Sequence, residues 1–153
     1  MAKINAFPTT VDWFAAEKAA RHAGLTVDMV NYLCRYGIIK PSACSKRGRG
    51  CIRKYTFSDI LLLRVVAKLL KNGVSVLRLR KSLIALQKRG KNTHDILSKK
   101  YVATDGYNIY FRDNDVLEIL ESGQMSFAFV LELSAVRKEL SEKIKREQKL
   151  SLH

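Results

Sequence analysis

Polar side chains at helical spacing between residues 26 and 35 could form hydrogen bonds with the edges of nucleic-acid bases. Thr26 suits a helix N-cap, and the helix after it is expected to run from Val27 to Tyr36, before Gly37. One side of this helix is apolar at i, i+3, i+4 spacing, with Val30, Leu33 and Cys34. The other side is polar, with Asp28, Asn31, Tyr32 and Arg35. Such a face fits the donor and acceptor pattern of a DNA major groove, where an Asn side chain can pair with adenine.

Basic residues in the next segment could contact phosphate. Pro41 prevents the helix from resuming, and residues 45–55 form a loop with Gly48 and Gly50 that returns through a short β-like segment. This pattern predicts a wing, a hairpin whose tip can reach phosphate or the minor groove. The basic side chains of the segment are Lys46, Arg47, Arg49, Arg53 and Lys54.

The basic residues are concentrated in one part of the chain. The 153 residues include 28 Lys or Arg and 14 Asp or Glu, for a formal net charge of +14. Residues 35–91 hold sixteen basic residues and one acid, Asp59, whereas residues 101–142 hold three basic and eight acidic residues. A basic block binds polyanions because it releases counterions condensed on phosphate. A solvated surface that binds nothing in particular is the weaker interpretation of so large an excess.

Alanine-rich residues 15–23 are predicted to form a helix that precedes the polar one. Alanine is the strongest helix former, and Gly24 is expected to end this helix. The short Ala-Gly-Leu-Thr connection between the two helices predicts a helix-turn-helix.

Two further helices are predicted after the wing. Ser58 is expected to cap a helix from Asp59 to Lys71, and Ser75 to cap another from Val76 to Arg89. The core stripe of the second helix is predicted at Val76, Leu79, Leu83 and Leu86.

The C-terminal third has strand-like character. Asp105-Gly106 lies between the strand-like runs 101–104 and 107–111, a sign of a two-residue hairpin loop. A short helix is expected over residues 115–121, and the apolar run Met125–Leu133 is expected to form a central strand. Ser134 is expected to cap a final helix whose apolar side carries Val136, Leu140 and Ile144. The predicted order of this part is ββαβα.

The predicted fold class is therefore α+β. Residues 1–91 are expected to form a winged helix-turn-helix domain, mostly α with a short wing. Residues 92–153 are expected to form a small ββαβα domain for dimerisation or sensing.

Several classes of protein are disfavoured. No apolar run approaches the roughly 18 residues of a membrane span, and no secretory signal is visible, so a cytoplasmic, nucleoid-associated location is expected. Cys34, Cys44 and Cys51 form no CxxC pair, which favours free thiols. His22, His94 and His153 lie in three different contexts. Neither a nucleophile–base constellation nor a phosphate-binding glycine motif is recognisable, so no enzyme activity, metal site or cofactor is expected.

Several of these segments, in this order, resemble the DNA-binding head of the MerR-type transcription regulators over roughly residues 13–89. The similar segments are Ala20–Thr26, Tyr32, Gly37–Pro41, Ile52–Ile60 and Asn72–Ser75. The resemblance implies a bacterial winged helix-turn-helix that binds an operator as a dimer. It implies that Thr26, Asn31, Tyr32 and Arg35 lie on the recognition helix. It also implies that Arg53 and Tyr55 contact backbone phosphate.

The chain departs from that family in two places. Val30-Asn31-Tyr32-Leu33 stands where the family usually has Leu-Arg-Tyr-aromatic, so Asn31 replaces a cation. Residues 91–93 interrupt the chain where the family's activators continue into a long dimerising helix, and no cysteine follows Cys51, so metal sensing is not expected.

The favoured hypothesis is a sequence-specific transcription regulator that binds double-stranded operator DNA as a homodimer. The alternative is an architectural or accessory DNA-binding protein, excisionase-like or nucleoid-associated, without effector sensing; an RNA-binding module is a weaker third possibility. Two-fold sites require two copies, and the surface joining them is expected in residues 125–133 and 134–149. A chain ending near Lys91 is then expected to be monomeric and to keep non-specific DNA affinity.

Overall fold

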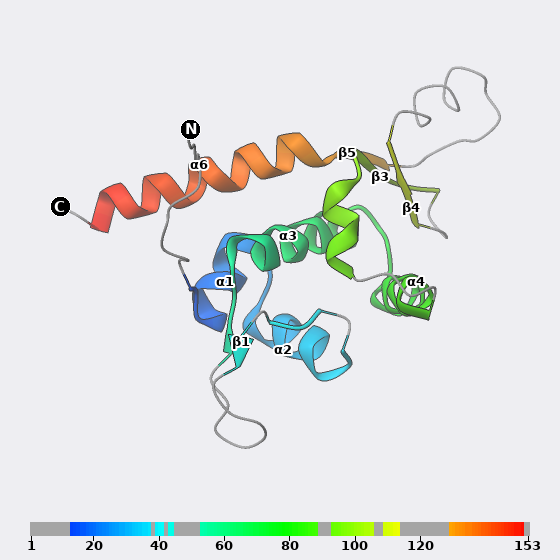
Figure 1. Ribbon diagram of the computed structural model, residues 1–153, viewed down its shortest axis with the longest axis horizontal. Coiled ribbons are helices and arrows are strands. Elements are labelled where there is room, and N and C mark those ends of the chain that lie inside the picture. Colours follow the sequence, from blue (N-terminus) through cyan, green and yellow to red (C-terminus); the bar gives the residue numbers. More distant parts are fainter. Residues whose placement is uncertain are drawn as a thin grey trace, which may run out of the picture.

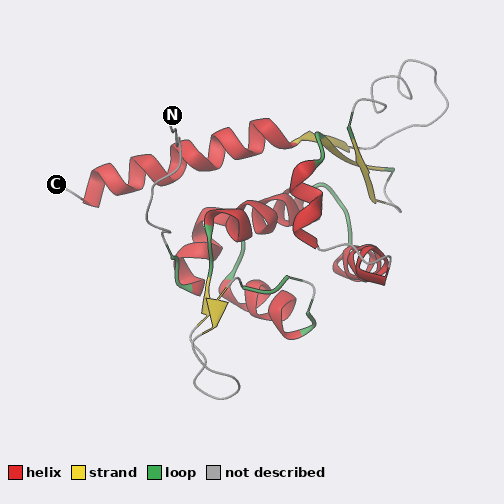
Figure 2. Cartoon of the chain, in the orientation of Figure 1, coloured by secondary structure: helices red, strands yellow, loops and turns green. Residues whose placement is uncertain are grey.

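The computed structural model describes residues 13–37, 39–41, 43–44, 53–88, 93–105, 109–113 and 129–151. Its elements follow in chain order: α1 (Ala16–Ala23), α2 (Val27–Arg35), β1 (Ala43–Cys44), β2 (Arg53–Lys54), α3 (Phe57–Lys71), α4 (Val76–Lys88), the 3-10 helix η1 (Thr93–Ser98), β3 (Tyr101–Thr104), β4 (Ile109–Arg112), β5 (Phe129–Glu132) and α6 (Leu133–Ser151). Figure 2 shows that helices make up most of the described chain, with strands in the wing and beside one end of α6. The predicted α+β class is confirmed.

The helix-turn-helix forms where its local signals predicted. Gly24 ends α1 in the left-handed region, with φ 82°, and its N–H is hydrogen-bonded to the carbonyls of Ala20 and Arg21. Thr26 caps α2, because its Oγ1 accepts a hydrogen bond from the Met29 N–H at 3.1 Å. The short turn between the helices therefore satisfies backbone groups at both helix ends.

Helix α3 is the central helix of the described fold. Seven of its side chains are buried apolar groups: Ile60, Leu61, Leu62, Leu63, Val65, Val66 and Leu69. Its cap corrects the sequence prediction, since Thr56 rather than Ser58 occupies the N-cap. The Thr56 hydroxyl accepts from the Asp59 N–H at 3.3 Å, and the Asp59 carboxylate accepts from the Thr56 N–H at 2.9 Å. This reciprocal pair satisfies two terminal N–H groups, which a cap at Ser58 would not do.

Helix α4 begins after Ser75, as predicted, and the Ser75 hydroxyl accepts from the Arg78 N–H at 3.1 Å. Leu79 and Leu83 of the predicted core stripe are buried. Val76 is half-buried, and the side chain of Leu86 lies outside the described set.

The three-stranded sheet corrects two predictions. Its order is β4-β3-β5, so β5 lies at an edge of the described sheet and β3 is central. Phe129, Val130 and Leu131 of β5 are half-buried rather than fully buried, as is usual for an edge strand. Apolar character on both faces of a run therefore did not determine its place in the sheet. The register pairs Thr104 with Ile109, so the hairpin connection spans the four residues 105–108 rather than two. The predicted helix 115–121 and residues 125–128 lie outside the described residues.

The apolar side chains of this hairpin and of β5 face the core. Val102, Ile109, Phe111, Phe129 and Leu131 all belong to the main hydrophobic cluster or pack against it. The observed register pairs Val102 with Phe111, whereas a two-residue loop would pair Val102 with Ile109. The two registers differ by two residues and leave the same side chains on the core face, so the apolar pattern does not distinguish them.

Helix α6 lies across α1 and α3, as Figure 1 shows, while the β1–β2 hairpin projects from the opposite side of these helices. The predicted stripe of Val136, Leu140 and Ile144 is buried and belongs to the same cluster as Ala19 and Leu61. The helix begins at Leu133, one residue before the predicted cap Ser134, whose hydroxyl donates to Glu132 at 2.6 Å.

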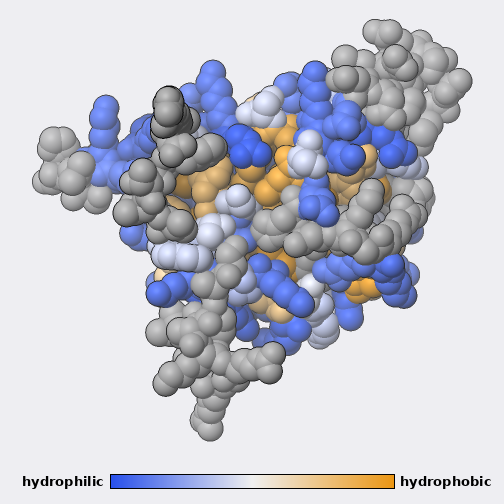
Figure 3. All heavy atoms as spheres, viewed as in Figure 1, coloured by the Kyte–Doolittle hydropathy of each residue, from blue (hydrophilic) through white to orange (hydrophobic). Residues whose placement is uncertain are grey.

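The surface drawn in Figure 3 is mostly hydrophilic over the described residues, with hydrophobic side chains visible in a band below α6. Within the described part of the chain, no helix has both the length and the apolar character needed to cross a membrane.

Candidate nucleic-acid interface

Helix α2 presents its polar side away from the core. Val30 and Leu33 are fully buried and fix the rotation of the helix about its axis. As a result Thr26, Asp28 and Arg35 are exposed, and Asn31 and Tyr32 are half-buried. The five side chains predicted on the recognition helix therefore lie on or near its accessible side.

The base of the predicted wing is an antiparallel strand pair. Strands β1 and β2 align Ala43 with Lys54 and Cys44 with Arg53. Phe14 and Tyr55 exchange two backbone hydrogen bonds of 2.9 Å beside this pair, which fixes the hairpin base to the start of α1. The predicted tip residues Lys46, Arg47 and Arg49 lie outside the described residues. Lys54 is exposed at the base.

A side-chain hydrogen bond connects the wing base with α2. Arg53 Nη1 donates to Asn31 Oδ1 at 2.9 Å, and both side chains are half-buried. Two residues predicted as separate DNA contacts, one on each element, are thus brought together.

Tyr55 does not occupy the position that the resemblance implied. Its side chain has no exposed surface, and its hydroxyl lies 3.0 Å from Cys34 Sγ. Burial and this hydrogen bond raise the pKa of the Tyr55 hydroxyl, and burial also raises the pKa of the Cys34 thiol. Both groups are therefore neutral at physiological pH, and a fully buried hydroxyl offers no surface to phosphate. We leave Tyr55 out of the candidate interface.

Tyr36, at the end of α2, and Arg80, in α4, were not predicted from the sequence as residues of the candidate interface. The Tyr36 ring lies 4.7 Å from the Tyr32 ring, and the Arg80 guanidinium lies 4.4 Å from the Tyr36 ring centroid. Tyr36 is 45% exposed, so this stack adds a cation and an aromatic group to the accessible side of α2. Tyr32 and Tyr36 are four residues apart, which helical spacing could have indicated. The approach of Arg80 is a tertiary contact that no local pattern encodes.

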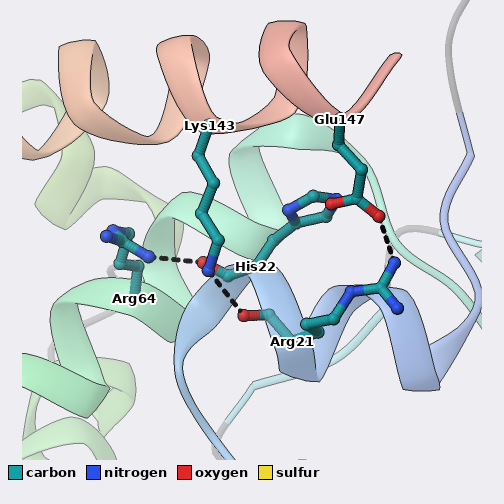
Figure 4. Close-up of polar contacts among 5 residues, drawn as sticks. All are labelled: Arg21, His22, Arg64, Lys143 and Glu147. Atoms are coloured by element: carbon teal, nitrogen blue, oxygen red, sulfur yellow. Dashed lines mark hydrogen bonds and ion pairs between the residues drawn. The ribbon is translucent and has the colours of Figure 1, made fainter. Parts of the chain in front are cut away.

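Cations from α3 and α6 hold the end of α1, the first helix of the helix-turn-helix (Figure 4). Lys143 Nζ donates to the Arg21 carbonyl at 2.9 Å, and Arg64 donates to the His22 carbonyl. Positive groups are favourable at these carbonyls because the C-terminal end of a helix carries partial negative charge. Arg21 also forms an ion pair with Glu147.

A second group of charges joins α3 to α6. Arg64 forms an ion pair with Glu139, and Lys68 Nζ lies 3.5 Å from the same carboxylate. The hydrogen bond from Arg64 lowers the pKa of Glu139 below its usual range. Helix α6 therefore fixes α1 and α3 through charged groups as well as through its apolar stripe.

His22 lies inside this contact. It is 2% exposed, and its Nε2 lies 3.3 Å from a Glu147 oxygen. Burial lowers the pKa of His22 despite the opposing effect of Glu147. The imidazole is therefore neutral at physiological pH. Its Nδ1 has no hydrogen-bond partner among the described residues.

The helix-turn-helix, the wing base and the two helices that follow cover the part of the chain that matches a known family. Residues 14–86 match the model of the MerR HTH family regulatory proteins. We refer to residues 14–86 as the MerR segment because they match this family model. Its borders agree with the resemblance seen over roughly residues 13–89.

Three relatives extend the similarity beyond this MerR segment. They are uncharacterized HTH-type transcriptional regulators, one of Mycobacterium bovis and two of Mycobacterium tuberculosis strains. Each is 29% identical over 139 residues, which are 90% of this chain and 60% of the relative. The chain thus spans about 60% of the length of the curated relatives it matches.

Proposed function

We propose that the protein is a transcription regulator that binds operator DNA in a sequence-specific manner. Helix α2 would enter the major groove, and the β1–β2 hairpin would lie over the adjacent backbone. The observation that carries this proposal is the contact between Arg53 and Asn31, which joins the two elements beside the exposed Arg35 and Lys54. The MerR segment and the names of the relatives support the same conclusion.

The proposed contacts have different tasks. Thr26, Asp28, Tyr32 and Arg35 would face the groove from α2, where Thr26 can still donate its hydroxyl proton while its oxygen caps the helix. Lys54 and Arg53 would contact phosphate from the wing base, and Lys46, Arg47 and Arg49 would reach phosphate or the minor groove from its tip. Phosphate contacts orient a protein on the duplex, whereas base contacts select the sequence.

Selection of bound duplexes from a random pool, with the full chain, tests sequence specificity. A single enriched motif is the expected result. Equal affinity for unrelated duplexes, accompanied by bending, would instead favour an architectural or accessory DNA-binding protein.

Two exposed lysines test where the DNA lies. Lys54→Ala should reduce the slope of log affinity against log salt by about one unit, because one phosphate contact is lost. Lys138→Ala removes the same charge from α6, on the side of the molecule opposite to the hairpin. The second variant should leave the slope unchanged, and equal effects of the two variants would argue against the proposed face.

We also propose that the protein binds its operator as a homodimer, since a helix-turn-helix usually reads two half-sites. The apolar stripe of α6 is covered by the same chain, which removes this stripe from the expected dimer surface. Strand β5, at an edge of the described sheet, is the remaining candidate. Light scattering on the full chain is expected to give twice the mass of one chain, and a monomer would contradict this part of the proposal.

A further inference from the structure

The hydrogen bond between α2 and β2 fixes the orientation of the Asn31 amide. A guanidinium group can only donate hydrogen bonds, so the Asn31 atom that faces Arg53 must be the oxygen. Arg53 Nη1 lies 2.9 Å from this oxygen. The amide NH2 of Asn31 is thus directed away from Arg53.

This orientation restricts the adenine contact expected from the sequence. To pair with adenine, an asparagine accepts a hydrogen bond from N6 through its oxygen and donates one to N7 through its NH2. The oxygen of Asn31 already accepts from Arg53. Its second lone pair could accept from adenine N6, but the amide would then have to satisfy Arg53 and the base in a single orientation.

A neutral partner also preserves the charge of Arg53. Among the described residues, no carboxylate forms an ion pair with Arg53. Its guanidinium keeps a full positive charge and further N–H donors, and the Asn31 amide keeps its own donors. The positive charge and the N–H donors favour the binding of an anion such as phosphate. The exposed Lys54, which follows Arg53 directly in β2, adds a second positive charge.

We propose that Asn31 is a positioning residue for Arg53 and that the two side chains together bind one backbone phosphate. In this arrangement Asn31 selects no base. The inference rests on the proposed DNA-binding function. Asn31, which stands where the family usually has an arginine, would thus take part in the phosphate contact.

Substitution by Asp gives the sharpest test, because Asp has the shape of Asn and keeps an acceptor for Arg53. Asn31→Asp should hold Arg53 but cancel its charge and repel phosphate. It should therefore reduce the salt slope by about one unit, as Arg53→Ala does. If Asn31 read a base, Asn31→Asp would instead shift the preference at one position toward cytosine, whose amino group a carboxylate accepts.

Removal of the side chain tests the coupling between the two residues. Asn31→Ala should weaken binding to selected and unrelated duplexes alike, by about fivefold, the effect of losing one hydrogen bond. In a chain that already carries Arg53→Ala, the same change should have almost no further effect, because the residue it positions is absent. Circular dichroism and thermal unfolding of each full-length variant identify loss of fold.

The outcomes separate this inference from the proposed function. Equal losses on all duplexes, an unchanged selected motif and non-additive effects support it. A motif altered at one base pair per half-site, or losses of Asn31→Ala and Arg53→Ala that add, would overturn it while leaving the DNA-binding function intact. A wild-type chain that binds no duplex at low salt would overturn both.

Discussion

Tyr55 and Cys34 illustrate how burial changes the chemistry of a side chain. A tyrosine beside a basic strand could donate its hydroxyl to phosphate, but Tyr55 has no exposed surface and its hydroxyl contacts the Cys34 thiol. Because Cys34 belongs to α2, the same contact joins Tyr55 to the core-facing side of that helix. The pair therefore links the wing base to the inner side of α2, as Asn31 and Arg53 link it on the outer side.

Tyr55→Phe should accordingly lower the free energy of unfolding by about 1 kcal/mol, the typical net value of one hydrogen bond. DNA affinity and its salt slope should remain those of the wild type, because no phosphate contact is lost. Urea unfolding and a salt titration of duplex binding measure the two effects. A reduced salt slope, like that expected for Arg53→Ala, would show that Tyr55 reaches phosphate after all.

His22 makes the contact between α1 and α6 sensitive to pH. Its pKa is lowered by burial, so the unfolded chain binds a proton more readily than the folded protein does. The free energy of unfolding should therefore decrease as the pH falls below about 6.5, the ordinary value for histidine. The lowered pKa of Glu139 acts in the same direction only at lower pH, below its ordinary value of 4.5.

Urea unfolding between pH 7.5 and 5.5 isolates the contribution of His22. His22→Gln should be less stable at pH 7.5, because it replaces a buried aromatic ring, and its stability should vary less over this interval. A variant with the same pH dependence as the wild type would exclude His22 as the titrating group. Duplex binding measured at pH 7.5 gives a control for the fold of the variant.

At the scale of elements, helix ends were predictable wherever the signal was local. Gly24 and Thr26 act through backbone groups within four residues, so the sequence shows both the residue and its partner. At α3 two hydroxyl residues, Thr56 and Ser58, compete for one cap. Asp59 decides between them, because only Thr56 has a partner at the third helical position.

Sheet order and register were not predictable in the same way. The position of β5 depends on β3, about 28 residues earlier. The hairpin register pairs Val102 with Phe111, although a pairing with Ile109 would keep the same side chains on the core face. The candidate interface shows the same division. Helical spacing identified the accessible side of α2, but the contacts of Arg53 with Asn31 and of Arg80 with Tyr36 join residues far apart in sequence.

Helix α6 offers a matched pair of leucines for testing its packing. Leu140 of α6 is fully buried in the main hydrophobic cluster, whereas Leu150 of the same helix is 75% exposed. Leu140→Ala should lower the free energy of unfolding by about 2–5 kcal/mol through lost transfer energy and a cavity. Leu150→Ala should change it by less than about 0.5 kcal/mol. Similar effects in urea unfolding would mean that α6 does not pack in solution as described.

At the scale of the whole molecule, residues 93–151 complete the core of the MerR segment. Ile96, Val102, Val136 and Leu140 belong to one hydrophobic cluster with residues of α1 and α3. The boundary expected near residue 91 therefore separates two stretches of sequence that share a core.

A chain ending near Lys91 should for this reason be poorly folded rather than a stable monomeric head. Its α1 and α3 would expose the apolar surface that α6 and η1 cover, and Arg64 would lose Glu139. Circular dichroism should show broad, low-temperature unfolding, and a dye that binds exposed apolar surface should fluoresce. Cooperative unfolding at the temperature of the full chain would contradict this prediction and restore the head as an independent unit.

The contact between α1 and α6 also sets the order of events during synthesis. Arg21 and its partner Glu147 are separated by 126 positions in the chain. At roughly 5–20 residues per second, about 6–25 s pass between the translation of the two residues. During this interval the ribosome carries a nascent chain whose α1 and α3 cannot yet bury their apolar sides, and closing so long a loop is slow even after release. The nascent chain therefore exposes apolar helix surface, to which chaperones can bind, until α6 has been made.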